Sequence, residues 1–135
     1  MRKFIILVTL IFSISTIVTY EQKTGLITVN TRFSGILDGY DHNNKTMVYL
    51  DGKLAGETSA LLQSKPNSCI LTANKGTHTI RIINMAEYEG NWEEHTLINQ
   101  YSLDALYTGE INLNKEITID LVFDISEKKT LARIE

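Results

Sequence analysis

The chain has 135 residues, with 13 basic and 16 acidic side chains and a formal net charge of −3. This length is typical of one domain, and the sequence has no basic stripe of the kind that neutralises nucleic-acid phosphates or an anionic membrane surface. Its single cysteine, Cys69, excludes an intramolecular disulfide, so the fold must depend on its core. The composition therefore argues against a nucleic-acid-binding protein and against a disulfide scaffold.

The first 20 residues predict an export signal. Basic "MRK" is followed by the apolar run "FIILVTLIFSISTIV" and then by polar residues, which is the order found in secretory signal peptides. The apolar run is shorter than the ~20 residues that span a bilayer comfortably. We expect residues 1–20 to be a helical segment, either cleaved as a signal peptide or kept as a membrane anchor.

Residues 21–135 are then expected to form one exported domain that is periplasmic, extracellular or on the cell surface. Removal of residues 1–20 takes away two basic side chains and no acid, so the net charge becomes 11 − 16 = −5.

The rest of the chain alternates between short runs of apolar and β-branched residues and turns rich in Gly, Asp and Asn. In the last clear run, "KEITIDLVFDI", Ile119 and Phe123 are expected to face the core. The charged tail, residues 125–135, is expected to fray. The predicted strands cover residues 26–33, 46–50, 53–58, 69–73, 77–84, 96–103, 110–114 and 115–125. Seven or eight short strands at this spacing predict an all-β fold, a single antiparallel β-sandwich.

Two turns stand out between predicted strands. Asp51-Gly52 is a strong hairpin signal, because a type I′ turn needs positive φ at both central residues. Lys75-Gly76 also lies where the chain leaves one strand and enters the next. We interpret Asp51, Gly52, Lys75 and Gly76 as structural turn residues without a chemical role.

Four segments together resemble a PEGA-type domain, a small exported β-sandwich module. They are "GLITVNT", "VYLDGKLAGET", "LTANKGTHTIRI" and "ITIDLVFD", in that order between Gly25 and Asp124. The Pro-Glu-Gly-Ala run of the family is absent, and Ser59-Ala60 stands where a proline is expected. The resemblance implies a non-catalytic envelope or extracellular module, with contacts to surface-layer or cell-wall components, and it carries over no catalytic residue.

The segment "EYEGNWEEH" is the candidate ligand-binding region, and the sequence pattern predicts a long polar loop. Its candidate residues are Tyr88, Trp92, Glu93 and Glu94. Aromatic rings beside carboxylates suit sugar recognition, because the ring packs on the sugar and the acids accept hydroxyl hydrogen bonds. Two alternatives remain open: the tryptophan anchors the core or a loop, or two glutamates act as a glycosidase pair.

Other reactive residues form no recognised motif. Asp38, Asp41 and Asn43 offer oxygen ligands for calcium, but their spacing is not that of an EF-hand, and a solvated turn is the alternative. No zinc motif joins the three histidines at 42, 78 and 95. Cys69 is interpreted as a small buried residue rather than a nucleophile paired with a histidine. No metal or cofactor is expected.

These observations predict a protein that is not an enzyme. It is expected to be a non-catalytic, exported or envelope-associated binding module whose partner is an envelope protein or a polysaccharide. The alternative is a small carbohydrate-binding module that uses the Trp92 loop.

Overall fold

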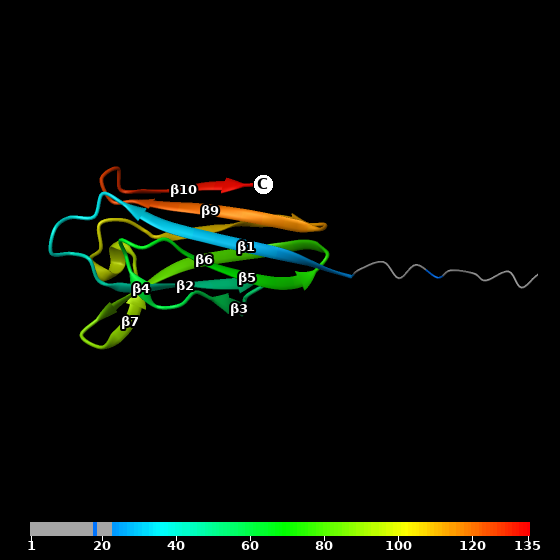
Figure 1. Cartoon of the computed structure of the whole chain (residues 1–135), viewed down its shortest axis with the longest axis horizontal. Coiled ribbons are helices and arrows are strands. Elements are labelled where there is room, and N and C mark those ends of the chain that lie inside the picture. The colour runs from blue at the N-terminus through cyan, green and yellow to red at the C-terminus, as the bar shows by residue number, and fades with distance from the viewer. Residues whose placement is uncertain (1–17, 19–22) are drawn as a thin grey trace, which may run out of the picture.

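The computed structural model describes residue 18 and residues 23–135, and in this part the chain is built almost entirely of strands (Figure 1). The elements are β1 (Thr24–Ser34), β2 (Asn43–Leu50), β3 (Lys53–Glu57), β4 (Leu61–Leu62), β5 (Asn67–Asn74), β6 (Gly76–Tyr88), β7 (Asn91–Glu94), the 3-10 helix η1 (Leu97–Asn99), β8 (Leu106–Leu113), β9 (Glu116–Asp124) and β10 (Lys129–Ile134). The predicted all-β class is confirmed. The predicted signal or anchor helix, residues 1–20, lies outside the described residues apart from Val18.

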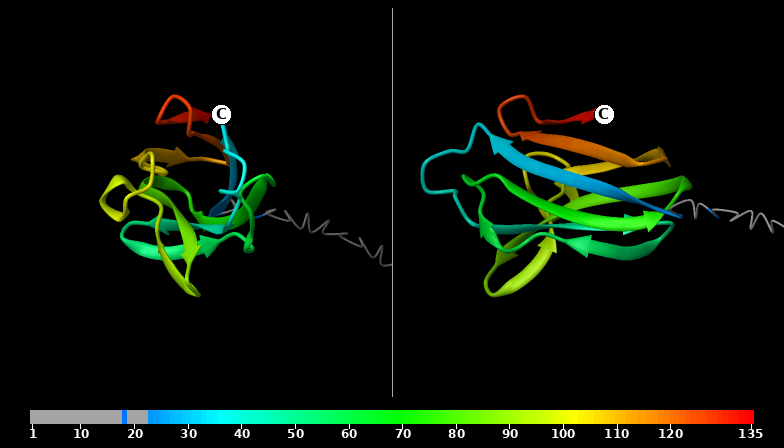
Figure 2. Two further views of the ribbon diagram at one scale, coloured as in Figure 1. Left: turned by 90° about the vertical axis from the view of Figure 1, so that its left-hand side faces the viewer. Right: turned by 45° about the vertical axis from the view of Figure 1, so that its right-hand side comes forward.

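The strands form two sheets that lie across from each other (Figure 2). One sheet has the order β10-β9-β1-β5. The other has the order β3-β2-β6-β7, with β4 paired to β2 and β8 paired to β6. No helix in the described part of the chain is long and apolar enough to cross a bilayer.

A single hydrophobic core lies between the two sheets, and both contribute to it. Alternation along each strand places every second side chain on the inner face. Ile119 and Phe123 of β9 are fully buried there, as the sequence pattern predicts. The buried apolar residues of the core are Ile27, Val29, Val48, Leu50, Leu71, Ile80, Ile82, Leu103, Ala105, Ile111, Leu113, Ile119, Leu121 and Phe123.

The prediction of a purely antiparallel sandwich with seven or eight strands is wrong in two respects. The described residues form ten strands, because β4, β7 and β10 were not predicted and the predicted strand at residues 96–103 is not one. The "EYEGNWEEH" segment is not a loop but the end of β6, the turn and the second strand of the β6–β7 hairpin. Glu89 and Gly90 take positive φ values of 49° and 80° at its tip. In addition, β1 runs parallel to β9, with Ile27 opposite Ile117 and Phe33 opposite Phe123. Local sequence patterns do not show this pairing because it joins segments at opposite ends of the domain.

The predicted strand at residues 96–103 is instead the short helix η1 with its flanking turns. The Leu97 amide donates to Asp104 Oδ1 at 2.8 Å, and Asn99 Nδ2 donates to the Glu94 carbonyl at 2.8 Å. Gln100 ends the helix in the left-handed conformation. These side-chain bonds satisfy backbone groups locally, so the segment needs no partner strand.

The prediction that the tail, residues 125–135, frays is also wrong. Most of this tail forms β10, which pairs with β9 at the edge of the sheet. Lys128 takes a φ of 53° in the connecting turn, and the Glu127 amide donates to Asp124 Oδ1 at 3.0 Å. Arg133 Nη2 donates to Asp120 Oδ2 at 3.0 Å. A hairpin turn and a cross-strand ion pair therefore hold a segment whose high charge predicts disorder.

The two predicted turns have the expected backbone conformation, but they connect different kinds of strand pair. Asp51 and Gly52 have φ values of 51° and 81° and close the β2–β3 hairpin. Gly76, at φ 124°, carries the chain from β5 in one sheet to β6 in the other, so the Lys75-Gly76 turn is a corner between sheets.

His78 ties these two turns together. Its Nε2 lies 2.6 Å from the Asn74 carbonyl, which can only accept, and its Nδ1 lies 2.6 Å from Asp51 Oδ2. Both ring nitrogens therefore act as donors when the imidazole is charged. The hydrogen bond to Asp51, followed by the bond to the Asn74 carbonyl, raises the pKa of His78 above its ordinary 6.5. The same contact with His78 lowers the pKa of Asp51 below 3.8.

This contact predicts a pH-dependent stability. The contribution of His78 is complete below its unfolded-state pKa of 6.5 and is lost as the pH rises through its raised folded-state pKa. The contribution of Asp51 is lost only when the pH falls through its lowered folded-state pKa. We expect the free energy of unfolding, measured with urea, to fall as the pH rises above 6.5 and through the raised folded-state pKa of His78. The fall should be smaller in Asp51→Asn, and equal slopes in both proteins would contradict the assignment.

Candidate functional site

A groove of about 820 Å³ lies at one end of the two sheets. It lies where the loop of residues 35–42, the β6–β7 hairpin and the η1 segment come together, on the left of Figure 1. The residues that line it are Leu37, Gly39, Tyr40, Asp41, His42, Gln63, Glu87, Tyr88, Glu93, His95, Ile98, Asn99, Gln100, Tyr101, Ser102 and Ile125. The loops, rather than the strand faces, provide most of these side chains.

Closely packed rings form the floor of the groove. The His95 ring lies 4.2 Å from that of Tyr101 and 5.9 Å from that of His42, measured between centroids. Behind them, Phe33 contacts His95 at 5.1 Å and joins the cluster to Phe123 of the core at 5.0 Å. The floor is therefore continuous with the hydrophobic core, which holds its rings in place.

His95 is neutral in this position. It is buried, and burial lowers its pKa to about 4, with a further contribution from the nearby His42. Its Nδ1 lies 3.5 Å from the amide nitrogen of Gln63, a buried side chain that can donate to it. Because the ring carries no charge near neutral pH, it acts in the groove as a polar aromatic surface and not as a cation.

A carboxylate and a phenol are joined on the wall of the groove. The Tyr101 hydroxyl donates to Glu93 Oε1 at 2.7 Å. Desolvation, and then this contact with Glu93, raise the pKa of Tyr101 far above its ordinary 10.0. The phenol therefore stays protonated and fixes one oxygen of Glu93, while its other oxygen is not held by this bond.

The four residues of the predicted ligand-binding set lie on two faces of the β6–β7 hairpin. Tyr88 and Glu93 line the groove. Trp92 and Glu94 lie on the opposite face, where Lys45 Nζ is 4.8 Å from the Trp92 ring centroid and Arg81 Nη2 donates to Glu94 Oε1 at 3.0 Å. The division follows from the alternation of side chains along β7, which the interpretation of this segment as a loop did not consider.

The weak calcium candidates are also separated by their contacts. Asp41 accepts hydrogen bonds from the Ser64 amide and hydroxyl at 3.0 and 2.6 Å, and these lower its pKa. Asn43 donates to Glu87 Oε2 at 3.0 Å, whereas Asp38 is exposed in the turn. In residues 23–135, no group of three His, Cys, Asp or Glu side chains is arranged to hold a metal ion.

Cys69 lies on β5 and packs against the core as a partly buried side chain. Desolvation raises the pKa of its thiol. A protonated thiol is a poor nucleophile, so the position suits the structural interpretation of this residue.

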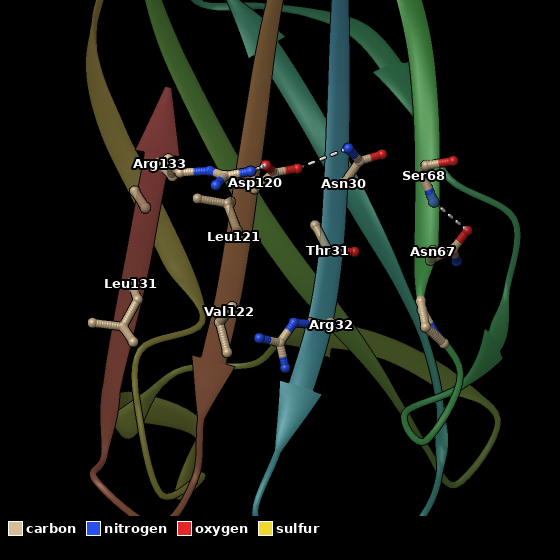
Figure 3. A pocket seen from close by; sticks show the side chains of 12 residues that line it. Asn30, Thr31, Arg32, Asn67, Ser68, Asp120, Leu121, Val122, Leu131 and Arg133 are labelled. Carbon is tan, nitrogen blue, oxygen red and sulfur yellow. Dashed lines mark hydrogen bonds and ion pairs between the residues drawn. The ribbon is translucent and has the colours of Figure 1, made fainter. Parts of the chain in front are cut away.

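A second, shallower hollow of about 600 Å³ lies over β1, β9 and β10, beside the start of β5 (Figure 3). Asp120 is one of its lining residues and accepts from Asn30 Nδ2 at 2.8 Å and from Arg133 Nη2 at 3.0 Å. These two bonds lower the pKa of Asp120. Because the three side chains satisfy one another across three strands, they stabilise the sheet and offer little to a ligand.

Sequence reasoning missed several residues of the groove. Tyr40, His42 and His95 come from segments predicted as polar loops, and Tyr101 comes from the segment at residues 96–103 that was predicted as a strand. The only sequence signal for a binding site was the enrichment of aromatic and histidine residues in these segments. An exposed aromatic ring is better evidence for such a site than a buried one. The strand topology brings these loops to one end of the domain, and a single sequence does not specify it.

No protein-family model and no curated protein matches this chain. Among solved structures, the chain is similar to one described as "Crystal Structure of Gram Negative Toxin", with a TM-score of 0.39 and 10% sequence identity. The match covers 83% of this chain and 23% of the toxin chain. A likeness at this level supports no transfer of fold or function, and the resemblance to PEGA-type domains stays a prediction.

Proposed function

We propose that this protein is a non-catalytic, exported binding module that holds a saccharide in the groove between residues 35–42 and the η1 segment. One observation carries the proposal. Three tyrosines and two carboxylates line the same open groove: Tyr40, Tyr88, Tyr101, Asp41 and Glu93. The proposed centre of recognition is this groove, and not the opposite face of the β6–β7 hairpin that carries Trp92 and Glu94.

The exposed rings support a ligand with an apolar face. Tyr40 is 70% exposed and Tyr88 is 59% exposed, although both are large aromatic side chains that are favourable to bury. A pyranose ring presents one face of C–H groups that packs on such a ring, while its edge carries hydroxyls. The carboxylates beside the tyrosines accept hydrogen bonds from those hydroxyls.

A binding role suits these side chains better than catalysis. Glu93 Oε1 already accepts a hydrogen bond from the Tyr101 hydroxyl, so this oxygen is engaged by the protein itself. His95 is buried and packed against the rings of Tyr101 and His42, so proton transfer would need a charged state that burial opposes. The saccharide is therefore proposed as a ligand and not as a substrate.

The test is a calorimetric titration of the full chain with a panel of oligosaccharides. We expect Tyr40→Ala and Tyr88→Ala each to weaken binding by about tenfold, because each removes one stacking surface. Trp92→Ala serves as the matched control, since its ring packs beside Lys45 on the opposite face of the hairpin.

Two results would contradict this assignment. Loss of binding in Trp92→Ala with normal binding in the tyrosine variants would move the site to the outer face of β7. If no oligosaccharide binds the full chain, a saccharide is not the ligand.

A further inference from the structure

The sheet β10-β9-β1-β5 ends on one side at β10, and this edge is open. The backbone groups of Thr118 and Glu135 exchange hydrogen bonds at 3.0 Å in both directions, so these residues form a hydrogen-bonded pair of the β9–β10 ladder. Because such pairs alternate along an antiparallel ladder, the amides and carbonyls of Thr130, Ala132 and Ile134 point away from β9. No strand lies beyond β10 in the described part of the chain, so these backbone groups are available to another strand.

Two other edge strands are less suited to such pairing. β3 carries a register shift opposite Val48 and Tyr49, and irregularities of this kind disfavour pairing at an edge. β5 lies against the same hairpin, because a Cβ at Gly56 of β3 would be 3.4 Å from Leu71 Cδ2. β10, in contrast, pairs with β9 without a shift along its whole length and contains neither proline nor glycine.

The side chains of β10 leave apolar surface exposed at this edge. Leu131 is 47% exposed and Ile134 is 42% exposed. Figure 3 shows Leu131 on the side of β10 away from β9, whereas Arg133 extends toward Asp120. The arginine charge is therefore engaged within the sheet, although a charge at an edge strand usually serves to block pairing. The edge thus offers both free backbone groups and apolar side chains to a partner strand.

The spacing of the free backbone groups suits a second copy of the same strand. Thr130, Ala132 and Ile134 are symmetric about Ala132, so an antiparallel two-fold arrangement brings all of them together in one register. Ala132 then pairs with Ala132 of the second copy, and Thr130 pairs with Ile134. Each of these pairs exchanges two hydrogen bonds, as hydrogen-bonded pairs of an antiparallel ladder do. This register uses every free residue of the edge.

Charge complementarity supports the same register. In the segment "KTLARIE", it places Lys129 opposite Glu135 of the second copy at both ends of the pairing. Opposite charges that face each other across two strands stabilise the pair. Lys129 forms no ion pair within residues 23–135, and the Glu135 carboxylate lies 3.4 Å from Arg133 Nε on its own strand. Leu131 lies opposite Arg133 of the second copy, whose aliphatic stem can cover it.

We propose that two copies of this chain associate through β10, in antiparallel two-fold pairing centred on Ala132, and thereby join their sheets into one continuous sheet. The interface is a single strand pair, so the dimer is small in buried area and reversible. The proposal does not depend on saccharide binding. Because the pairing is antiparallel, the grooves of the two copies lie at opposite ends of the dimer (Figure 1).

The test is sedimentation velocity of the full chain over a wide range of concentrations. We expect the mass to rise with concentration from 15.3 kDa to about twice this value. Lys129→Glu and Glu135→Lys should each weaken the dimer about tenfold, because each places like charges at both ends of the pairing. An equimolar mixture of these two variants should restore it, since each chain then supplies the charge that the other has lost.

Two further variants separate the edge from the rest of the molecule. Ala132→Pro removes an amide that points to the free edge and keeps the bonds between β9 and β10. It should prevent association and leave the urea midpoint of the monomer unchanged. Lys53→Glu is the matched control for charge, because Lys53 is an exposed lysine on β3 of the other sheet. It should associate as the wild type does.

Two results would overturn the proposal. A chain that stays monomeric at every concentration would leave this edge to a strand of another protein. A dimer that is equally strong in the wild type, in both single-charge variants and in their mixture would be held by another surface. If Ala132→Pro fails to fold, the mixture of the charge variants still decides between these outcomes.

Discussion

Replacement of Phe123 by alanine is expected to lower the free energy of unfolding by about 3–5 kcal/mol. Phe123 is fully buried near the C-terminal end of β9, and its ring contacts that of Phe33 at 5.0 Å between centroids. Truncation removes apolar contacts and leaves a cavity between two sheets that cannot close around it. Urea unfolding followed by circular dichroism measures the change.

Val122→Ala is the matched control for this prediction. Val122 is the preceding residue on the same strand and lies on the opposite face, where it is only partly buried. Its truncation should cost less than about 1 kcal/mol. Similar losses in both variants would show that β9 does not present alternate residues to the core.

The second large effect is expected at a polar position. Asn84 is fully buried on β6, and its Nδ2 donates to Asn44 Oδ1 at 2.7 Å and lies 3.3 Å from Thr46 Oγ1. Asn84→Ala removes both bonds and leaves the buried Asn44 oxygen without its donor. We expect a loss of about 1–3 kcal/mol for that unsatisfied group alone, measured as a lower urea midpoint.

Two further variants test the origin of this loss. Asn112→Ala changes an exposed asparagine on β8 and should have little effect. Asn44→Ala combined with Asn84→Ala should cost clearly less than the sum of the single changes, because the first loss already breaks the shared bond. Additive losses would mean that the two amides act independently.

The sequence predicted the parts of this fold that depend on local spacing. Alternation in "KEITIDLVFDI" identified the inward positions of β9. The Asp51-Gly52 turn was identified because few residue types readily adopt positive φ. The tail and the β6–β7 hairpin were missed because their structure does not depend on local spacing. Their charged side chains favour a frayed end and a polar loop, whereas cross-strand pairs such as Arg133 with Asp120 order the tail. Short sequence windows do not contain these pairs.

The candidate site was predicted only in part, for a related reason. Tyr88 and Glu93 were singled out from a segment rich in rings and acids, and both line the groove. Trp92 and Glu94 were grouped with them, although strand alternation turns them to the other face. Tyr101, His95 and Tyr40 needed the tertiary fold, because only the packing of loops from both sheets brings their rings together.

The parallel pairing of β1 with β9 has a consequence for the order of folding. β1 covers residues 24–34 and β9 covers residues 116–124, so one edge of β1 stays without its partner until nearly the whole domain has been synthesised. Contacts between such distant segments close large loops and form slowly. The sheet that contains the first strand is therefore expected to be completed last, only after β9 has been synthesised.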